Sequence, residues 1–398
     1  MKSELKKVPI ESLCIGIYDG PHATPPKSDS GAVFLGISNF SNGRLDLSNI
    51  RYISEDDLPK WTKRVTPKAH DIVFSYEATL NLYAIIPEGF YGCLGRRMAL
   101  IRPDESKVDY RFLYYYMYSS QWREEIERHK VNGSTVDRIP LVSFPSFTVN
   151  LPSMATQKYI AEILSVLDEK IELNNRLNDN LEQQAQAYFQ ELFVDNFDPI
   201  WALGTVSDLG AVVGGSTPSK SKPEYYTEDG IAWITPKDLS LNKAKFISHG
   251  ENDITELGLK NSSASIMPEG TVLFSSRAPI GYIAIASGEV TTNQGFKSVV
   301  PKPEIGTAYV YYFLKHNLPV IEGMASGSTF KEVSGSTMKN VPAVIPDTET
   351  LACFNNFCAP IFAQQRILEE QNQSLATLRD SLLPKLMSGE IDVSDIKL

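Results

Sequence analysis

The feature that most constrains the fold is a long internal repeat. The segment NGSTVDRIPLVSFPSFTVNLPS, which starts at Asn132, recurs as SGSTFKEVSGSTMKNVPAVIPD from Ser326. Weaker matches occur upstream in the same order, with DIVFS from Asp71 aligned to TVLFS from Thr271. Self-similarity over such a distance means that one folding unit occurs twice. The chain of 398 residues is therefore predicted to be a tandem duplication.

Each repeat has a β-rich part followed by a helical part. The first part contains short β-branched and aromatic runs separated by Gly, Pro, Asn and Asp, which is typical of strands and turns. The second part has seam positions that alternate steps of four and three residues, from Ile160 to Leu192 and again from Phe354 to Leu386. This is the heptad spacing of a coiled coil.

The predicted fold is α+β, with two β-rich domains in tandem separated by a long antiparallel two-helix coiled coil. Pairing is expected because neither helix can bury its apolar stripe alone, and a solvated linker helix is the alternative. The predicted segments are a first β-rich domain at 1–153, a first helix at 154–195, a second β-rich domain at 196–347, and a second helix with a C-terminal tail at 348–398. Polar seam residues are expected to fix the register: Asn174, Asn178, Gln365 and Asn372.

The net charge of −10 at first sight opposes a nucleic-acid partner, because phosphate binding needs clustered Lys and Arg. The charge is unevenly distributed, however. Residues 154–199 hold 3 basic and 9 acidic side chains, and residues 348–398 hold 4 and 7. These helical segments carry nine of the ten net negative charges, so the β-rich segments are nearly neutral and nucleic-acid binding by them is not excluded.

Motifs for metal binding and catalysis are missing from the sequence. The four cysteines form no CxxC pair and the five histidines have no ligand spacing, so no metal site is predicted. There is no GxGxxG and no Walker A loop, and the one Pro-Pro, Pro25-Pro26, lacks the context of a methyltransferase loop. The chain also has no signal peptide and no membrane-length apolar run. We expect a cytoplasmic, non-catalytic protein without a cofactor of its own and without a membrane partner.

Five segments, found together and in one order, point to a known family. They are GGSTPSKSKPEYYTEDGIAWITPKDLS from Gly214, SSRAPIGYIAI from Ser275, TTNQGFKSVVP from Thr291, ASGSTFKEVSGSTMKNVPAVIP from Ala325 and LRDSLLPKLMSGEIDVSD from Leu378. Over nearly its whole length the chain resembles the specificity (HsdS) subunits of type I restriction-modification enzymes. The first repeat departs from the pattern, with DGPHATPPKS and SYEATLNLYAI in place of the second repeat's segments, which is expected to alter specificity rather than fold.

The resemblance implies different roles for the β-rich domains and for the helices. Each β-rich domain would be a target recognition domain that reads one half of a split double-stranded DNA sequence. The helix pair would set the spacer and dock two methyltransferase (HsdM) subunits, and two motor-nuclease (HsdR) subunits would join for restriction. S-adenosylmethionine, ATP and Mg would bind to those partner subunits.

Candidate DNA-binding side chains are of two kinds. Gly-Ser-Thr loops and GGSTPSKSK combine backbone N–H groups, hydroxyls and lysines, which suit phosphate oxygens, whereas Arg suits guanine and Asn or Gln suits adenine. Tyr76, Tyr225 and Tyr226 could line the groove or belong to the core. The predicted DNA-binding residues are Lys27, Arg96, Arg97, Ser134, Thr135, Thr217, Lys220, Lys222, Lys237, Arg277, Asn293, Gln294, Lys297, Ser328, Thr329 and Lys331.

Two alternative functions remain open at this point. A stand-alone DNA methyltransferase or nuclease would bind its cofactor or cleave DNA itself, and the missing motifs oppose it. A coiled-coil scaffold that never touches DNA would show no salt-dependent DNA binding, which separates it from the leading hypothesis.

Overall fold

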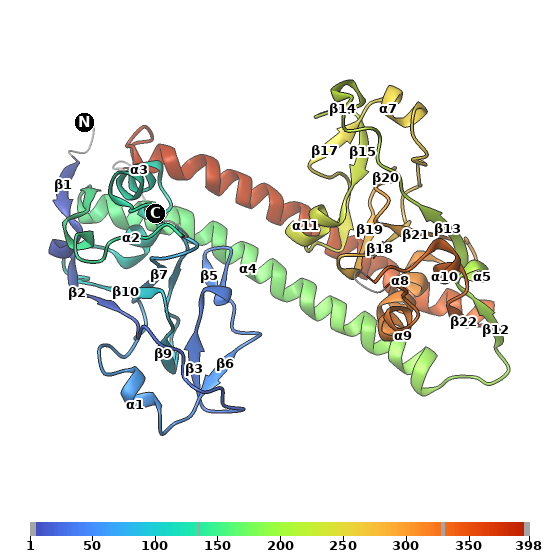
Figure 1. Cartoon of the computed structure of the whole chain (residues 1–398), viewed down its shortest axis with the longest axis horizontal. Helices are drawn as coiled ribbons and strands as arrows, with labels where there is room; N and C mark the ends of the chain where they lie inside the picture. Colours follow the sequence, from blue (N-terminus) through green and yellow to red (C-terminus); the bar gives the residue numbers. More distant parts are fainter. Residues whose placement is uncertain (1–4, 134–135, 328–330, 394–398) are drawn as a thin grey trace. The chain divides into compact units, whose positions relative to one another are not determined.

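The computed structural model describes residues 5–133, 136–327 and 331–393, and the chain folds as two compact units (Figure 1). The first unit is Met1–Lys170 with Ser374–Leu398, and the second is Ile171–Gln373. Each unit therefore combines one β-rich region with parts of both long helices. The division into four segments at 153, 195 and 347 stays a prediction.

Strands of the first unit form a large antiparallel sheet and smaller sheets beside it. The strands are β1 (Lys6–Pro9), β2 (Cys14–Asp19), β3 (Ala32–Leu35), β4 (Phe40–Ser41), β5 (Arg44–Leu45), β6 (Arg51–Ile53), β7 (Ile72–Ser75), β8 (Tyr83–Ile85), β9 (Gly92–Leu94), β10 (Met98–Pro103) and β11 (Thr148–Leu151). The large sheet has the order β2-β10-β7-β8, and a smaller one has the order β6-β3-β9. Strand β1 pairs with β11, and β4 with β5.

The second unit contains β12 (Ala202–Thr205), β13 (Gly210–Gly214), β14 (Tyr226–Thr227), β15 (Ile231–Ile234), β16 (Phe246–Ile247), β17 (Asn252–Ile254), β18 (Val272–Ser276), β19 (Ile280–Ala286), β20 (Thr291–Thr292), β21 (Lys297–Pro301) and β22 (Pro342–Ile345). Its large sheet has the order β13-β21-β18-β19-β16, its smaller sheet has the order β14-β17-β15-β20, and β12 pairs with β22.

The two units repeat one topology. The main strands match in chain order and sense of pairing, including the antiparallel trio β2-β10-β7 against β13-β21-β18, whereas the short strands β4, β5, β14 and β16 have no counterpart. Even the parallel pair β3–β9 has its counterpart in β15–β20. The prediction of an α+β fold with two β-rich domains in tandem is confirmed, because the repeated apolar runs form the same strands in each copy.

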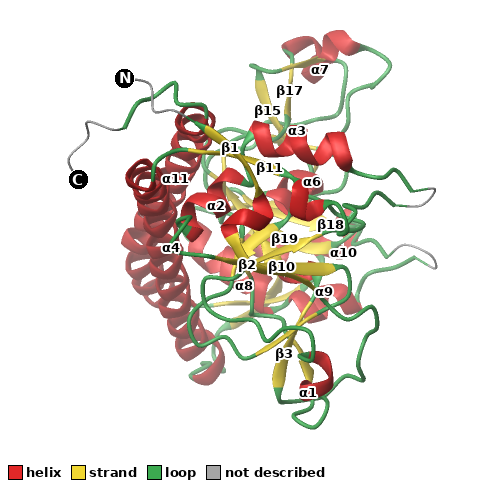
Figure 2. Ribbon diagram, turned by 90° about the vertical axis from the view of Figure 1, so that its left-hand side faces the viewer, coloured by secondary structure: helices red, strands yellow, loops and turns green. Residues whose placement is uncertain are grey.

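Helices complete both units. They are α1 (Leu58–Trp61), α2 (Tyr110–Tyr116), α3 (Ser120–His129), α4 (Met154–Gln190), α5 (Val206–Leu209), α6 (Pro236–Leu241), α7 (Glu256–Lys260), α8 (Thr307–His316), α9 (Leu318–Gly323), α10 (Gly335–Lys339) and α11 (Thr348–Met387). Helix α4 continues into a π-helical turn, η4 (Glu191–Asp195), and 3-10 turns are η1 (Ile10–Leu13), η2 (Ile37–Asn39), η3 (Phe144–Ser146) and η5 (Pro223–Tyr225). The small sheets have short helices beside them, α1 near β3 and α7 near β17 (Figure 2).

Aromatic side chains dominate the two main cores. In the first unit, Phe74 of β7 stacks on Phe144, with ring centroids 4.8 Å apart, and Trp122 of α3 meets Phe144 edge to face. In the second unit, Phe354 of α11 and Tyr309 of α8 pack around Phe193. Such large rings bury much apolar area, so each unit has its own core and fixes its own segments of α4 and α11.

Within each unit the segments of α4 and α11 contact each other in antiparallel order. In the second unit, Asn174 Nδ2 donates to Asn372 Oδ1 at 2.9 Å, and Gln365 Nε2 donates to the carbonyl of Asn178 at 3.2 Å. In the first unit, Arg379 Nη1 lies 2.7 Å from Asp168 Oδ1. All four predicted register residues therefore lie at the contact between the helices, and their role in fixing the register stays a prediction.

Candidate nucleic-acid interface

In the second unit, three chain segments meet at one end of the large sheet. Ser216 N, after β13, donates to Thr292 O at 2.8 Å, and Ser276 N, at the end of β18, donates to Gly295 O at 2.7 Å. Gly215 permits this approach, because a Cβ there would lie 1.9 Å from the carbonyl oxygen of Asn293. Backbone hydrogen bonds thus hold the segments together independently of the exposed side chains.

This framework brings four predicted residues together. Thr217 Oγ1 donates to Gln294 Oε1. Lys297 Nζ donates to Gln294 O at 3.3 Å, and Asn293 Oδ1 accepts from Gly295 N at 2.8 Å. Amide, hydroxyl and ammonium groups side by side can form hydrogen bonds with base edges and phosphates.

A carboxylate that sequence reasoning missed lies between the cations of this group. Glu332 is 3.5 Å from Arg277 Nη1 and 3.7 Å from Lys297 Nζ. Burial lowers the pKa of Lys297, and the charge of Arg277 adds to this effect while Glu332 opposes it. The signal in the sequence is weak, because Glu332 follows the Gly-Ser-Thr loop as one polar residue among several.

Other predicted residues of this unit lie outside that group. Lys237 of α6 forms an ion pair with Glu251 at 2.5 Å, and Lys222 Nζ lies 5.2 Å from the ring centroid of Tyr225. Lys220 and Lys331 are exposed. Tyr225 is buried, and Tyr226 donates to Pro218 O at 2.6 Å, so both tyrosines support the loop. Four predicted residues lie outside the described residues: Ser134, Thr135, Ser328 and Thr329.

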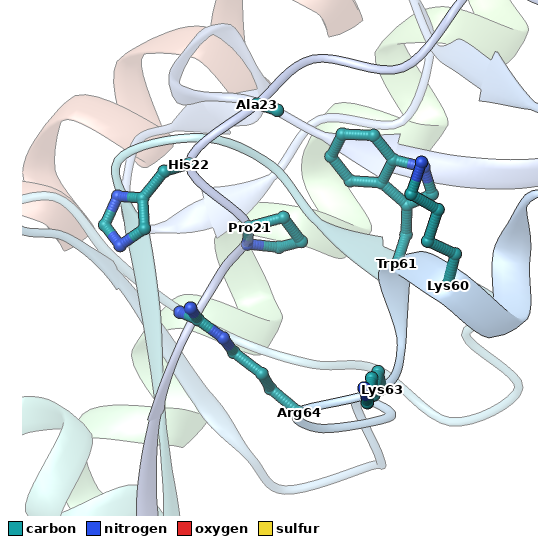
Figure 3. A pocket seen from close by; sticks show the side chains of 7 residues that line it. All are labelled: Pro21, His22, Ala23, Lys60, Trp61, Lys63 and Arg64. Carbon is teal, nitrogen blue, oxygen red and sulfur yellow. The ribbon is translucent and has the colours of Figure 1, made fainter.

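The first unit carries a basic pocket at the corresponding end of its large sheet. The loop after β2 and the end of α1 line an open pocket of about 350 Å³ (Figure 3). Figure 3 shows Arg64 and His22 on one side of Pro21 and Lys60 beside Trp61 on the other. The lining residues are Pro21, His22, Ala23, Lys60, Trp61, Lys63 and Arg64. A cavity with several cations and an indole ring can hold a phosphate group.

Contacts link the pocket to the predicted residue Arg97. Asp19 forms an ion pair with Arg64 and lies 3.1 Å from His22 Nε2, while His22 Nδ1 is 3.4 Å from the hydroxyl of Tyr76. Tyr76 N donates to Arg97 O at 3.1 Å. Burial, and then the charge of Asp19, raise the pKa of Tyr76.

Arg97 itself has a positive φ of 68° and its Nε lies 2.9 Å from Glu77 Oε1. Arg96 and Lys27 are exposed on the flanking turn and loop. The structure thus brings the predicted residue Arg97 together with Glu77, His22 and the pocket cations. These latter residues were not predicted. The basic and aromatic run KWTKR could have indicated the pocket.

Other kinds of site have little support in the described part of the chain. There, no group of three or more His, Cys, Asp or Glu side chains could hold a metal ion. Nor does any described helix combine the length and the apolar character that a membrane span needs.

Comparisons with known proteins agree with this arrangement. The family model of the type I restriction modification DNA specificity domain matches residues 22–183 and 200–379. The MjaIX specificity subunit of Methanocaldococcus jannaschii is 40% identical over 191 residues, which cover 46% of this chain and 44% of that protein. The HindI specificity subunit of Haemophilus influenzae is 25% identical over 441 residues, covering 90% of this chain and 94% of that one.

A solved structure shows the same fold. The crystal structure of the type I restriction-modification S subunit from M. genitalium superposes with a TM-score of 0.61 at 18% identity, covering 97% of this chain and 96% of that one. The alignment with the MjaIX subunit spans less than half of that relative's length, whereas the family model matches both repeats. The chain belongs to the family of type I restriction-modification DNA specificity proteins.

Proposed function

We propose that the chain is the DNA sequence-recognition subunit of a type I restriction-modification complex. Each β-rich domain reads one half of a bipartite double-stranded target. One observation carries this proposal. In both units, hydrogen-bonding and basic side chains lie at the same end of the large sheet, on a rigid backbone framework. Phosphate contacts position such a protein on DNA, and base-edge contacts specify the sequence.

The two kinds of contact come from different residues. In the first domain, the pocket cations Lys60, Lys63 and Arg64 suit phosphate oxygens. In the second domain, Lys220 and Lys222 on their exposed loop have that role. Base edges are read by side chains on the backbone framework: Arg96, Arg97, Arg277, Asn293, Gln294 and Lys297.

Helices α4 and α11 form a long antiparallel coiled coil that sets the spacer between the half-sites. The contacts of Asn174 with Asn372 and of Arg379 with Asp168 support this part of the proposal. The acidic helices repel DNA and offer their surfaces to protein partners. Those partners are two methyltransferase (HsdM) and two motor-nuclease (HsdR) subunits, which hold S-adenosylmethionine, ATP and Mg, while this chain is non-catalytic.

The test is selection from a pool of random-sequence duplex DNA by the full chain with its methyltransferase partner. Sequencing of the bound fraction should return two short motifs at a fixed separation. Binding should weaken as salt rises, because phosphate contacts release counterions. Bound DNA without an enriched motif would contradict sequence recognition.

A further inference from the structure

Each β-rich domain has an isolated antiparallel bridge near the end of the central strand of its large sheet. One residue of the bridge follows that strand. The other belongs to the segment that returns toward the long helix. In the first domain this bridge joins Glu77, after β7, to Arg138. In the second domain it joins Arg277, after β18, to Glu332. The same kind of bridge therefore carries one carboxylate and one guanidinium in both domains, with their places exchanged.

Backbone hydrogen bonds show that the two bridges are equivalent. Tyr76 N donates to Arg97 O in the first domain, as Ser276 N donates to Gly295 O in the second. On the returning segment, Ile139 N donates to Tyr76 O at 2.7 Å, and Val333 N donates to Ser276 O at 2.9 Å.

In each domain, the bridge residue of the returning segment also takes part in a second isolated bridge. Arg138 pairs with Val131, and Glu332 pairs with Ser326. The sequence repeat gives the same alignment, because Glu77 and Arg277 follow DIVFS and TVLFS at the same distance, and Arg138 and Glu332 follow the two Gly-Ser-Thr loops at the same distance.

The charged groups of these bridges are available to a ligand. The side chains of Arg277 and Glu332 are 38% and 39% exposed, and Arg138 is exposed as well. Glu77 has the cation Arg97 beside it, and Glu332 has Lys297 as well as Arg277. Both sites thus present a donor and an acceptor at adjacent positions on a fixed backbone.

We infer that this bridge pair determines specificity and that its donor and acceptor are in opposite order in the two domains. The inference rests on the proposed function. A guanidinium pairs with the O6 and N7 of guanine, whereas a carboxylate accepts from the N4 amino group of cytosine. At the step of DNA that faces this bridge, the second domain presents the guanidinium from the central strand, and the first domain presents a carboxylate there.

The deciding variant exchanges the two residues of the second domain, R277E/E332R. It keeps an ion pair across the bridge and leaves the net charge unchanged, so overall attraction to phosphate is retained. The full chain with its methyltransferase partner would be used to select from random-sequence duplex DNA. We expect the second half-site to change at the bases that face the bridge, with the original preference reduced about 5- to 150-fold, and the first half-site to be unchanged.

A neutral pair, R277Q/E332Q, covers the case in which the exchanged pair does not fold. It should lose the original preference at the same bases without reversing it. If the wild-type protein enriches a bipartite motif and a folded variant of either kind keeps the same second half-site, the inference is wrong and the proposed function stands. If the wild-type protein enriches no motif, the proposed function fails and the inference fails with it.

Discussion

The ammonium group of Lys245 donates a hydrogen bond to Gln365 Oε1 at a distance of 2.7 Å, from a side chain that is almost fully buried. The same ammonium forms an ion pair with Glu182 of α4 and lies 4.4 Å from the ring centroid of Phe362. Lys245 belongs to the β-rich domain, and its partners belong to the two long helices. In the second unit, one buried lysine therefore connects the β-rich domain to both helices.

Replacing this lysine should destabilise the second unit. Lys245→Met keeps the apolar stem but leaves Glu182 with Lys315 as its cation and leaves Gln365 Oε1 without its buried donor, so we expect a loss of about 1 to 3 kcal/mol in the free energy of unfolding. Urea unfolding followed by circular dichroism measures the loss. The matched control is Lys243→Met, because Lys243 is exposed two residues away. Equal midpoints for the two variants would show that the buried contact adds no stability.

Acid should weaken the same contact. Burial raises the pKa of Glu182, but Lys245 and Lys315 outweigh it and lower that pKa from 4.5 to about 2. A carboxyl group with a lowered pKa in the folded state stabilises the fold above its unfolded pKa, and this contribution is lost as the pH falls from 4.5 toward 2. The difference in unfolding free energy between the wild type and Glu182→Gln should therefore shrink over this range. A constant difference would mean that Glu182 has an ordinary pKa.

The sequence was sufficient for the duplicated topology but not for the charge pairing at the sites. Repeated runs such as DIVFS and TVLFS predict corresponding strands, because the same apolar pattern has the same faces to bury. The contact of Arg277 with Glu332 joins distant parts of the chain, and no local pattern sets its register.

The basic pocket was missed for a different reason. Most predicted site residues lie in segments that recur or that resemble the family. The second-unit counterpart of α1 is α7, whose sequence is ELGLK. Lys60 aligns with Lys260 of that helix, but Lys63 and Arg64 have no basic counterpart in the second repeat to draw attention to them. Their significance depends on the cavity formed with His22, which lies far away in the sequence.

The pocket should contribute affinity without sequence preference. The double variant Lys60→Ala/Lys63→Ala removes two cations, so the slope of log affinity against log salt should fall by about 1 to 2, at roughly 0.9 per phosphate contact. Affinity should drop by the same factor for target and non-target duplexes in a titration of the full chain. Lys158→Ala, an exposed lysine of α4, is the control and should change neither quantity. A change in the enriched motif would instead assign base contacts to the pocket.

Lengthening the helix pair should lengthen the spacer. Inserting one heptad after Lys170 in α4 and one after Gln373 in α11, where the two units meet along the chain, keeps the seam in phase and adds about 10 Å at 1.5 Å per residue, or about three base pairs of DNA. The half-site sequences should stay the same, because neither β-rich domain is altered. Selection from random-sequence duplex DNA measures the separation directly. A control insertion of seven residues at Gly288, where a side chain would meet open space, adds the same length outside the helices and should leave the spacer unchanged. If the heptad insertions, like the control insertion, leave the two motifs as far apart as in the wild type, helices α4 and α11 do not set the spacer.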